Sequence, residues 1–205
     1  MINLIISDTK RSLNYIKEIL KNDICINKII LYSIKNGLVS RFIKKEKIEK
    51  LLVICKTKNI NSPKILKKLE LYKSNLNIMS TYPGEIVKNY KLFKKGLLHA
   101  HSGDLPKFKG STTIYYSIIL KKKICVTLIL LNKEIDEGKI VYKKYFKNPK
   151  NLDEIEKNFD DNIRAKTLVE YLKNKKKFKI KKTNREFLHY NIAHPIIRHL
   201  VLKNR

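Results

Sequence analysis

Short apolar runs rich in β-branched residues alternate with segments of helical period along most of this chain. The runs predict strands and the amphipathic segments predict helices. Strands that are apolar throughout and are separated by helices are typical of a mostly parallel sheet covered by helices on both faces. The expected fold is therefore α/β and Rossmann-like. The expected strands are 2–7, 28–33, 51–55, 76–80, 97–102 and 125–131, and the expected helices are 11–20, 63–73, 111–121 and 152–172.

The length and the charge of the chain narrow the class of protein. Its 205 residues fit a single domain. The net charge of +28 comes from 46 Lys and Arg residues against 18 Asp and Glu, and six of the 46 are Arg. Surfaces that read phosphates with geometric specificity favour Arg, so this Lys-rich balance indicates a compositional bias more than a nucleic-acid surface. Nucleic acid is therefore a partner that is not favoured, whereas the summed charge favours an anionic small substrate.

The cysteines and the apolar segments indicate a cytoplasmic protein. Cys25, Cys55 and Cys125 are odd in number, far apart and set in apolar runs, which predicts buried thiols instead of a disulfide framework or a zinc site. The chain starts without a basic leader followed by a long apolar stretch, and no window approaches the length of a membrane span. No membrane association is expected.

The segment HAHSGDLPKFKGSTT, residues 99–113, concentrates His, Gly and Asp in a chain that uses them sparingly. It begins at the carboxyl end of an expected strand, where ligands bind in open α/β sheets. His99 and His101 are two residues apart, so on a strand they point to the same side. The turn-rich loop that follows leads into three hydroxyl residues able to cap the next helix.

The loop at 99–110 and the later segment VTLILLNKEIDEGKIV, residues 126–141, resemble the signature of the folate-dependent formyltransferases. Members of that family carry an Asn-x-His-x-Ser-Leu-Leu-Pro loop and a later Asp-x-Gly motif, separated by a strand. The resemblance extends over residues 1–172 and implies a single formyltransferase-like catalytic domain there. It implies an enzyme that moves a formyl group from 10-formyltetrahydrofolate to an amine. Residues 173–205 are expected to be a basic linker and an apolar segment that docks on the body or on a second subunit.

The resemblance assigns catalytic roles to three residues. Formyl transfer develops negative charge on oxygen and leaves excess positive charge on the attacking nitrogen, so the site needs a donor and a proton acceptor. His101 is expected to be the donor or general acid beside the oxyanion, and Asp136 is expected to orient it and to manage the proton. His99 stands where the family has Asn, and an imidazole can also donate a hydrogen bond. Taken alone, Asp136 could instead serve a turn in which Gly138 supplies the unusual backbone angles.

The resemblance also implies cofactor and substrate contacts. The segment TYPGEIVKNY, residues 81–90, corresponds to a part of the family that lines the folate pocket, although an ordinary turn before a helix is the alternative. The hydroxyl residues after the loop are candidate substrate contacts, with helix capping as their competing role. The expected folate-binding residues are Tyr82, Gly84, Glu85, Ile86, Tyr90, Asn132 and Ile135, and the expected substrate-binding residues are Gly110, Ser111, Thr112 and Thr113. No metal is expected.

The acceptor amine is the least determined part of this interpretation. The purine-pathway members use a glycine-rich loop after the first strand to bind a phosphate, and here that place reads SDTKRSLNYI, without glycine. The initiator-tRNA members carry a further carboxy-terminal domain, for which 33 residues after 172 leave no room. An amino sugar or sugar nucleotide is therefore the expected acceptor, and a homodimer is possible. The alternatives are a methionyl-tRNA formyltransferase-like enzyme without that domain and a non-catalytic RNA-binding protein on the same fold.

Overall fold

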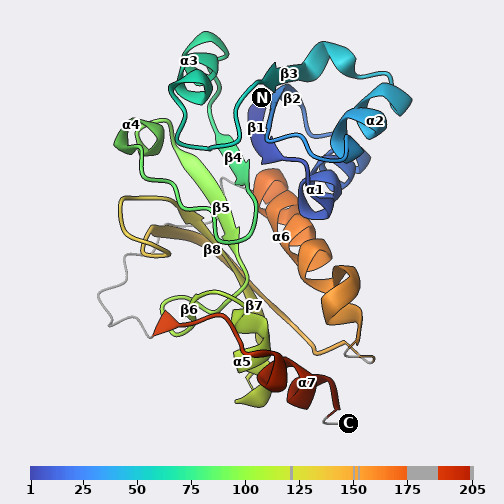
Figure 1. Ribbon diagram of the computed structural model, residues 1–205, viewed down its shortest axis with the longest axis vertical. Coiled ribbons are helices and arrows are strands. Elements are labelled where there is room, and N and C mark those ends of the chain that lie inside the picture. Colours follow the sequence, from blue (N-terminus) through green and yellow to red (C-terminus); the bar gives the residue numbers. More distant parts are fainter. Residues whose placement is uncertain (121, 150, 152, 175–188, 204–205) are drawn as a thin grey trace. The chain divides into compact units, whose positions relative to one another are not determined.

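The computed structural model describes residues 1–120, 122–149, 151, 153–174 and 189–203. Seven strands form one sheet in the order β3-β2-β1-β4-β5-β7-β8, and two further strands, β6 and β9, pair with each other (Figure 1). The pairs β1–β2, β1–β4, β2–β3 and β4–β5 are all parallel. The expected α/β class with a mostly parallel sheet is confirmed. The strands of the large sheet are β1 (Ile2–Ser7), β2 (Ile26–Tyr32), β3 (Leu52–Cys55), β4 (Asn77–Ser80), β5 (Leu97–His101), β7 (Ile124–Leu130) and β8 (Lys139–Phe146).

The chain divides into two compact units. The first unit contains residues 1–99 and 130–133, and the second contains residues 100–129 and 134–205. The expected boundary at residue 172 stays a prediction. None of the helices among the described residues is long and apolar enough to cross a membrane.

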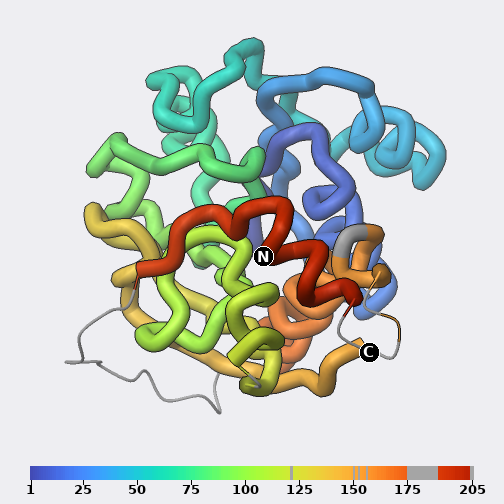
Figure 2. Tube along the Cα trace, turned by 60° about the horizontal axis from the view of Figure 1, so that its bottom comes forward, coloured from blue at the N-terminus to red at the C-terminus, as the bar shows by residue number. Residues whose placement is uncertain are grey.

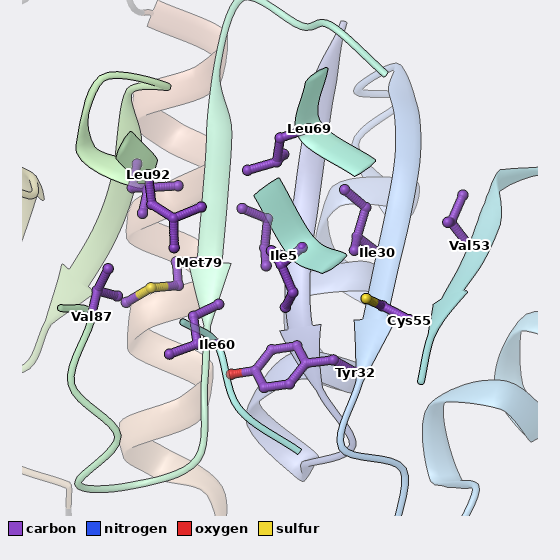
Figure 3. Close-up of a cluster of buried hydrophobic side chains, with 12 residues drawn as sticks. Ile5, Ile30, Tyr32, Val53, Cys55, Ile60, Leu69, Met79, Val87 and Leu92 are labelled. Carbon is purple, nitrogen blue, oxygen red and sulfur yellow. The ribbon is translucent and has the colours of Figure 1, made fainter. Parts of the chain in front are cut away.

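The first unit is organised around β1, which is buried along its whole length between β2 and β4. Its helices are α1 (Lys10–Lys21), α2 (Leu38–Lys45), α3 (Pro63–Leu71) and the short α4 (Tyr90–Phe93), with a 3-10 turn η1 (Glu49–Leu51) before β3. Thr9 caps α1 and Ser62 caps α3, each accepting a hydrogen bond from a backbone N–H of the first turn. A cluster of buried side chains from these elements, among them Ile5, Tyr32 and Met79, forms the core of this unit (Figure 3).

The second unit combines β7 and β8 with α5 (Thr113–Ile119), a π-helical turn η2 (Ile155–Phe159), α6 (Asp160–Asn174) and α7 (Pro195–Lys203). Helix α6 packs on β8 through stacking of Tyr171 on Tyr142, whose ring centroids lie 6.3 Å apart. Glu170 of α6 accepts hydrogen bonds from Tyr142 and Lys144 of β8. The two-stranded sheet pairs β6 (Lys109–Gly110) with β9 (His189–Tyr190) in parallel.

The sequence missed elements without a long apolar run. Strand β8 carries Lys or Tyr at five of its eight positions, and β6 and β9 contain two residues each. Helices α2, α4 and α7 were also not expected, and the helix expected at 152–172 starts as a π-helical turn. Of the expected basic linker and apolar segment at 173–205, residues 175–188 and 204–205 lie outside the described residues. Of the three thiols expected to be buried, Cys55 and Cys125 are buried, whereas Cys25 is exposed because it lies in the turn before β2.

Candidate active site

His101 ends strand β5 and is held by the loop that follows it. Its side chain is buried, and its Nε2 atom lies 2.7 Å from the carbonyl oxygen of Phe108. A carbonyl oxygen can only accept a hydrogen bond, so Nε2 carries a proton and donates it. The other ring nitrogen, Nδ1, is thereby left to face the rest of the site.

Asp136 faces that second nitrogen. Its Oδ1 atom lies 3.6 Å from Nδ1 of His101, and its Oδ2 atom accepts a hydrogen bond of 3.0 Å from the backbone N–H of Gly110. Asp136 itself adopts a left-handed conformation, with φ of 57°. Gly138 is not among the residues with positive φ, so the alternative in which this glycine supplies the unusual backbone angle is wrong. An aspartate tolerates that conformation better than most residues, at an energetic cost that is typical of functional positions.

Burial controls the protonation of His101. Removal from water lowers its pKa, and the nearby Arg164 adds to this effect. The opposite effect, a rise in the pKa, comes from Asp136, the Phe108 carbonyl and Asp160. The effect of burial is larger, so the pKa of His101 stays below its ordinary value. The imidazole is therefore neutral at pH 7, with a lone pair on Nδ1.

The pair of His101 and Asp136 consequently presents two proton acceptors to the same point. Nδ1 of a neutral imidazole and a carboxylate oxygen cannot hydrogen-bond to each other, but both can accept from an N–H group placed beside them. The Nε2–H group of neutral His101 already donates a hydrogen bond to the Phe108 carbonyl oxygen. The ring therefore has no free N–H group that could donate to an oxyanion. The arrangement fits a proton acceptor better than the donor expected from the sequence.

Close packing fixes the loop between His101 and Gly110. A Cβ on Gly103 would lie 2.5 Å from the Phe108 carbonyl oxygen and 2.6 Å from Nε2 of His101, so only glycine fits there. The hydroxyl of Thr127 donates to the Gly103 carbonyl at 2.5 Å and accepts from the backbone N–H of Leu105 at 3.2 Å. Strand β7 thus anchors the loop at two backbone positions.

Two further residues hold the same loop from β8. The ammonium group of Lys143 lies 2.7 Å from a carboxylate oxygen of Asp104 and also donates to the Leu105 carbonyl. The hydroxyl of Tyr145 donates to the same Asp104 oxygen at 3.2 Å. Asp104 was read from the sequence only as a turn residue, and its partners on β8 could not be identified because that strand was not expected.

Residue Arg164 was missed by the sequence analysis. Its guanidinium group donates to the carbonyl of Ala100 at 2.6 Å and to both carboxylate oxygens of Asp160 at 3.0 Å. The spacing of four residues between Asp160 and Arg164 on an expected helix is a signal for this ion pair. Its contact with β5 brings a positive charge close to His101.

Some of the predicted substrate residues form hydrogen bonds within the protein, and Ser111 is exposed. The hydroxyl of Thr113 is buried and donates to the Ser102 carbonyl. Thr112 is the N-cap residue of α5, but its side chain makes no capping bond, so the competing role of helix capping does not hold for it; its hydroxyl donates to the Ser111 carbonyl and accepts from the Ala193 N–H. Ser111 is exposed, and Gly110 contributes its N–H to Asp136.

The predicted folate residues of the first unit include two that are engaged within it. Tyr82 donates to the carbonyl of Ser33 at 3.1 Å, and Glu85 accepts from the Tyr32 hydroxyl at 2.6 Å and from the Ile60 N–H at 2.8 Å. Gly84 takes a positive φ in the turn between them. The other three, Ile86, Tyr90 and Asn132, are exposed. Ile135, in the second unit, is also exposed.

His99 lies on β5, opposite Met79 of β4, and is partly buried. It shares one face of the strand with His101, as the spacing of two predicted.

The connection after β1, which lacks the glycines of a phosphate-binding loop, carries an aspartate that binds backbone amides. The carboxylate of Asp8 accepts backbone N–H groups from Asn36 and Val39 at 2.9 Å each and from Lys35 at 3.3 Å. Burial raises the pKa of Asp8, but these hydrogen bonds outweigh burial and hold it below its usual value. The amides at the start of α2, which could bind an anion, are thus occupied by the protein's own carboxylate.

Sequence comparison finds methionyl-tRNA formyltransferases. No protein-family model matches the chain. The enzyme of Buchnera aphidicola is 36% identical over 77 residues, which are 36% of this chain and 24% of that protein. The enzyme of Thermodesulfovibrio yellowstonii is 30% identical over 135 residues, which are 63% of this chain and 39% of that protein. The chain thus spans less than half the length of these curated relatives.

Structural comparison finds the same fold in formyltransferases of two kinds. A sugar N-formyltransferase from Shewanella sp. has a TM-score of 0.64 at 18% identity, covering 98% of this chain and 86% of that one. Methionyl-tRNA formyltransferase from Clostridium thermocellum has a TM-score of 0.63 at 17% identity, covering 96% and 74%. An N-formyltransferase from Helicobacter canadensis, solved with folinic acid and dTDP-3-aminofucose, has a TM-score of 0.59 at 20% identity, covering 93% and 71%.

Proposed function

We propose that this chain is a formyltransferase, which transfers a formyl group from 10-formyltetrahydrofolate to a primary amine, as its similarity to curated and solved formyltransferases supports. The observation that carries the proposal is the pair formed by His101 and Asp136, two proton acceptors fixed by the loop between them. An amine that attacks a carbonyl carbon must lose a proton, and this pair is built to receive one.

The residues perform the transfer in one balanced exchange. The amine nitrogen bonds to the formyl carbon, and the bond between that carbon and the folate nitrogen breaks. The proton that the amine loses goes to Nδ1 of His101 or to the Asp136 carboxylate, and a proton returns to the departing folate nitrogen. Because Nε2 of His101 is held by Phe108, the ring presents Nδ1 throughout the reaction.

The folate part of the proposal is supported by the solved neighbours. The Helicobacter canadensis structure contains folinic acid, a formylated reduced folate. In this chain we assign folate binding to the segment at residues 81–90 and to Asn132 and Ile135. Ile86, Tyr90 and Ile135 are exposed apolar side chains of the kind that a pterin ring covers.

For the acceptor, we propose the amino group of a sugar nucleotide. The Asp8 carboxylate occupies the amides at the start of α2, which argues against the phosphate-bearing acceptor of the purine pathway. The Shewanella and Helicobacter canadensis structures provide the precedent for amino-sugar acceptors on this fold. A net charge of +28 favours the anionic diphosphate of such a substrate.

Methionyl-tRNA is a second candidate acceptor. The curated relatives at 30–36% identity are methionyl-tRNA formyltransferases, and the same positive charge suits a polyanion. A direct comparison separates the two. The purified chain is mixed with 10-formyltetrahydrofolate and either dTDP-amino sugars or methionyl-tRNA, and formylated product is measured by mass spectrometry.

The same assay contains its control. Asp136→Asn is expected to lower product formation with the true acceptor about 10²- to 10⁴-fold, whereas Asp153→Asn, which changes an exposed carboxylate outside the site, is expected to retain activity. Product with methionyl-tRNA alone would reassign the acceptor. No product with either class, from protein that is folded and binds reduced folate, would contradict the proposed acceptors.

A further inference from the structure

The segment after the basic run returns to the loop that holds His101. Strand β9 pairs with β6, with His189 opposite Lys109 and Tyr190 opposite Gly110, and the Tyr190 carbonyl accepts the N–H of Ser111 at 3.1 Å. Figure 1 shows β9 as the red arrow beside β6, and Figure 2 shows the same red segment running beside the yellow-green loop and α5. Docking of this segment on the body or on a second subunit was expected from its apolar residues, without any named contact.

The Tyr190 ring packs on the residue whose carbonyl holds His101. Its centroid lies 5.2 Å from that of Phe108, with the rings inclined by 22°, and 4.7 Å from that of Tyr116 on α5. Phe108 is buried and is the acceptor for Nε2 of His101. One side chain therefore stacks between the loop and the helix that follows it.

The backbone of Tyr190 lies against the second support of the site. A Cβ on Gly110 would collide with the Tyr190 carbonyl oxygen, so the two backbones pair only because residue 110 is glycine. The N–H of the same Gly110 donates to Asp136. Tyr190 thus contacts both residues that orient the two proton acceptors.

Two contacts beyond Tyr190 fix the segment in place. The N–H of Ala193 donates to Thr112 at 2.7 Å, and the guanidinium group of Arg198 on α7 donates to the Ala193 carbonyl at 3.1 Å and lies over the Tyr115 ring. These contacts join the segment to the start of α5. We call residues 189–198 the strap.

We propose that Tyr190 is a positioning residue, which through its ring and its backbone keeps Phe108 and Gly110 in the places from which they orient His101 and Asp136. The inference rests on the proposed function for its kinetic consequence. Its structural part concerns the state of the His101 ring and can be tested without any acceptor.

The experiment compares three variants of the full chain. Tyr190→Phe keeps the stacked ring, Tyr190→Ala removes it, and Ile192→Ala changes a side chain of the strap that is 66% exposed. Tyr190→Ala is expected to lower kcat about 10- to 100-fold with little change in KM, the range expected when catalytic groups are misplaced without loss of binding. Tyr190→Phe and Ile192→Ala are expected to stay close to the original protein.

NMR titration of the His101 imidazole supplies the readout that a merely structural role would not move. The groups that face this ring are Asp136, Asp160, Arg164 and the Phe108 carbonyl. Burial is the largest influence on its pKa and lowers it, so admission of water in Tyr190→Ala is expected to raise the pKa toward the ordinary value. Tyr190→Phe should titrate like the original protein.

The outcomes separate the two proposals. Unchanged kcat and unchanged His101 titration in folded Tyr190→Ala would overturn the positioning role, and so would loss of kcat with an unchanged titration. If the His101 titration shifts in Tyr190→Ala but the original protein formylates no acceptor, the positioning role of Tyr190 is supported and the proposed function is rejected. If Tyr190→Ala does not fold, Tyr190→Leu keeps an apolar body without a ring and is measured in the same way.

Discussion

The Nε2 atom of His101 and the carbonyl oxygen of Phe108, 2.7 Å apart, fix which ring nitrogen of this histidine is free for chemistry. The carbonyl oxygen accepts a hydrogen bond from the Nε2–H group, and Nδ1 faces Asp136. The histidine and the aspartate therefore act on the same proton and are expected to behave as one unit.

The first prediction follows from this unity. Asp136→Asn and His101→Asn are each expected to lower formyl transfer about 10²- to 10⁴-fold, since each removes a positioned proton acceptor. The double variant is expected to be little worse than the poorer single variant, because groups that act together are not additive. Steady-state kinetics of the three proteins decide this, with circular dichroism to verify folding. Multiplying losses, or full activity in Asp136→Asn, would contradict the shared role.

The second prediction concerns His99. His99→Asn restores the residue usual in the formyltransferase motif, and an amide N–H can donate to a carbonyl as an imidazole does. Activity is expected to be retained or raised if His99 only polarises the formyl group. The measurement is kcat across pH 5–9. A large loss in this variant would mean that His99 transfers a proton itself.

The third prediction concerns reduced folate. A ligand that binds only the folded state stabilises it by mass action, by about 2.7 kcal/mol at one hundred times its Kd. Saturating 5-formyltetrahydrofolate is therefore expected to raise the melting temperature of the chain. Differential scanning fluorimetry measures the shift, and a structurally unrelated aromatic acid at equal concentration is the control. The absence of any shift would count against the folate assignment.

The sequence predicted the structure best where apolar residues, functional side chains and turn residues lie next to one another along the chain. The strand at 97–101 and the loop after it were predicted because apolar residues, paired histidines and turn residues follow one another without interruption. The role of Phe108 could not be predicted, since it acts through a carbonyl that every residue possesses. Asp104 and Lys143 lie 39 residues apart, and nothing in their local sequence links them.

The fourth prediction concerns Asp8 and acid. Its pKa is held below the ordinary 3.8 in the folded chain, so its contribution to stability is complete above that value and is lost as the pH falls through the folded pKa. Asp8→Asn is expected to be less stable at pH 7 and to lose less stability than the original protein between pH 5 and pH 2. Urea unfolding across this range measures both slopes. If the unfolding free energies of the two proteins fell equally between pH 5 and pH 2, protonation of Asp8 would not be the cause of the loss of stability.

The fifth prediction contrasts two buried hydroxyls of the site. Thr127→Val removes the hydroxyl bonds to the Gly103 carbonyl and from the Leu105 N–H, leaves these two groups only their mutual bond of 3.1 Å, and is expected to cost about 0.5–1.5 kcal/mol. Among the described residues the Ser102 hydroxyl has no hydrogen-bond partner, so Ser102→Ala is expected to cost little or to stabilise. Chemical denaturation of both variants tests the contrast. Equal losses would mean that the Ser102 hydroxyl is satisfied in solution.

The pairing of Gly110 with Tyr190 also sets an order of events during synthesis. The two residues are 80 positions apart in the sequence. A growing polypeptide can form β1 to β5 and the loop after His101 long before residue 190 is made. The loop receives this neighbour only after residue 190 has been made, so chains interrupted before that residue would carry the catalytic pair without the segment that steadies it.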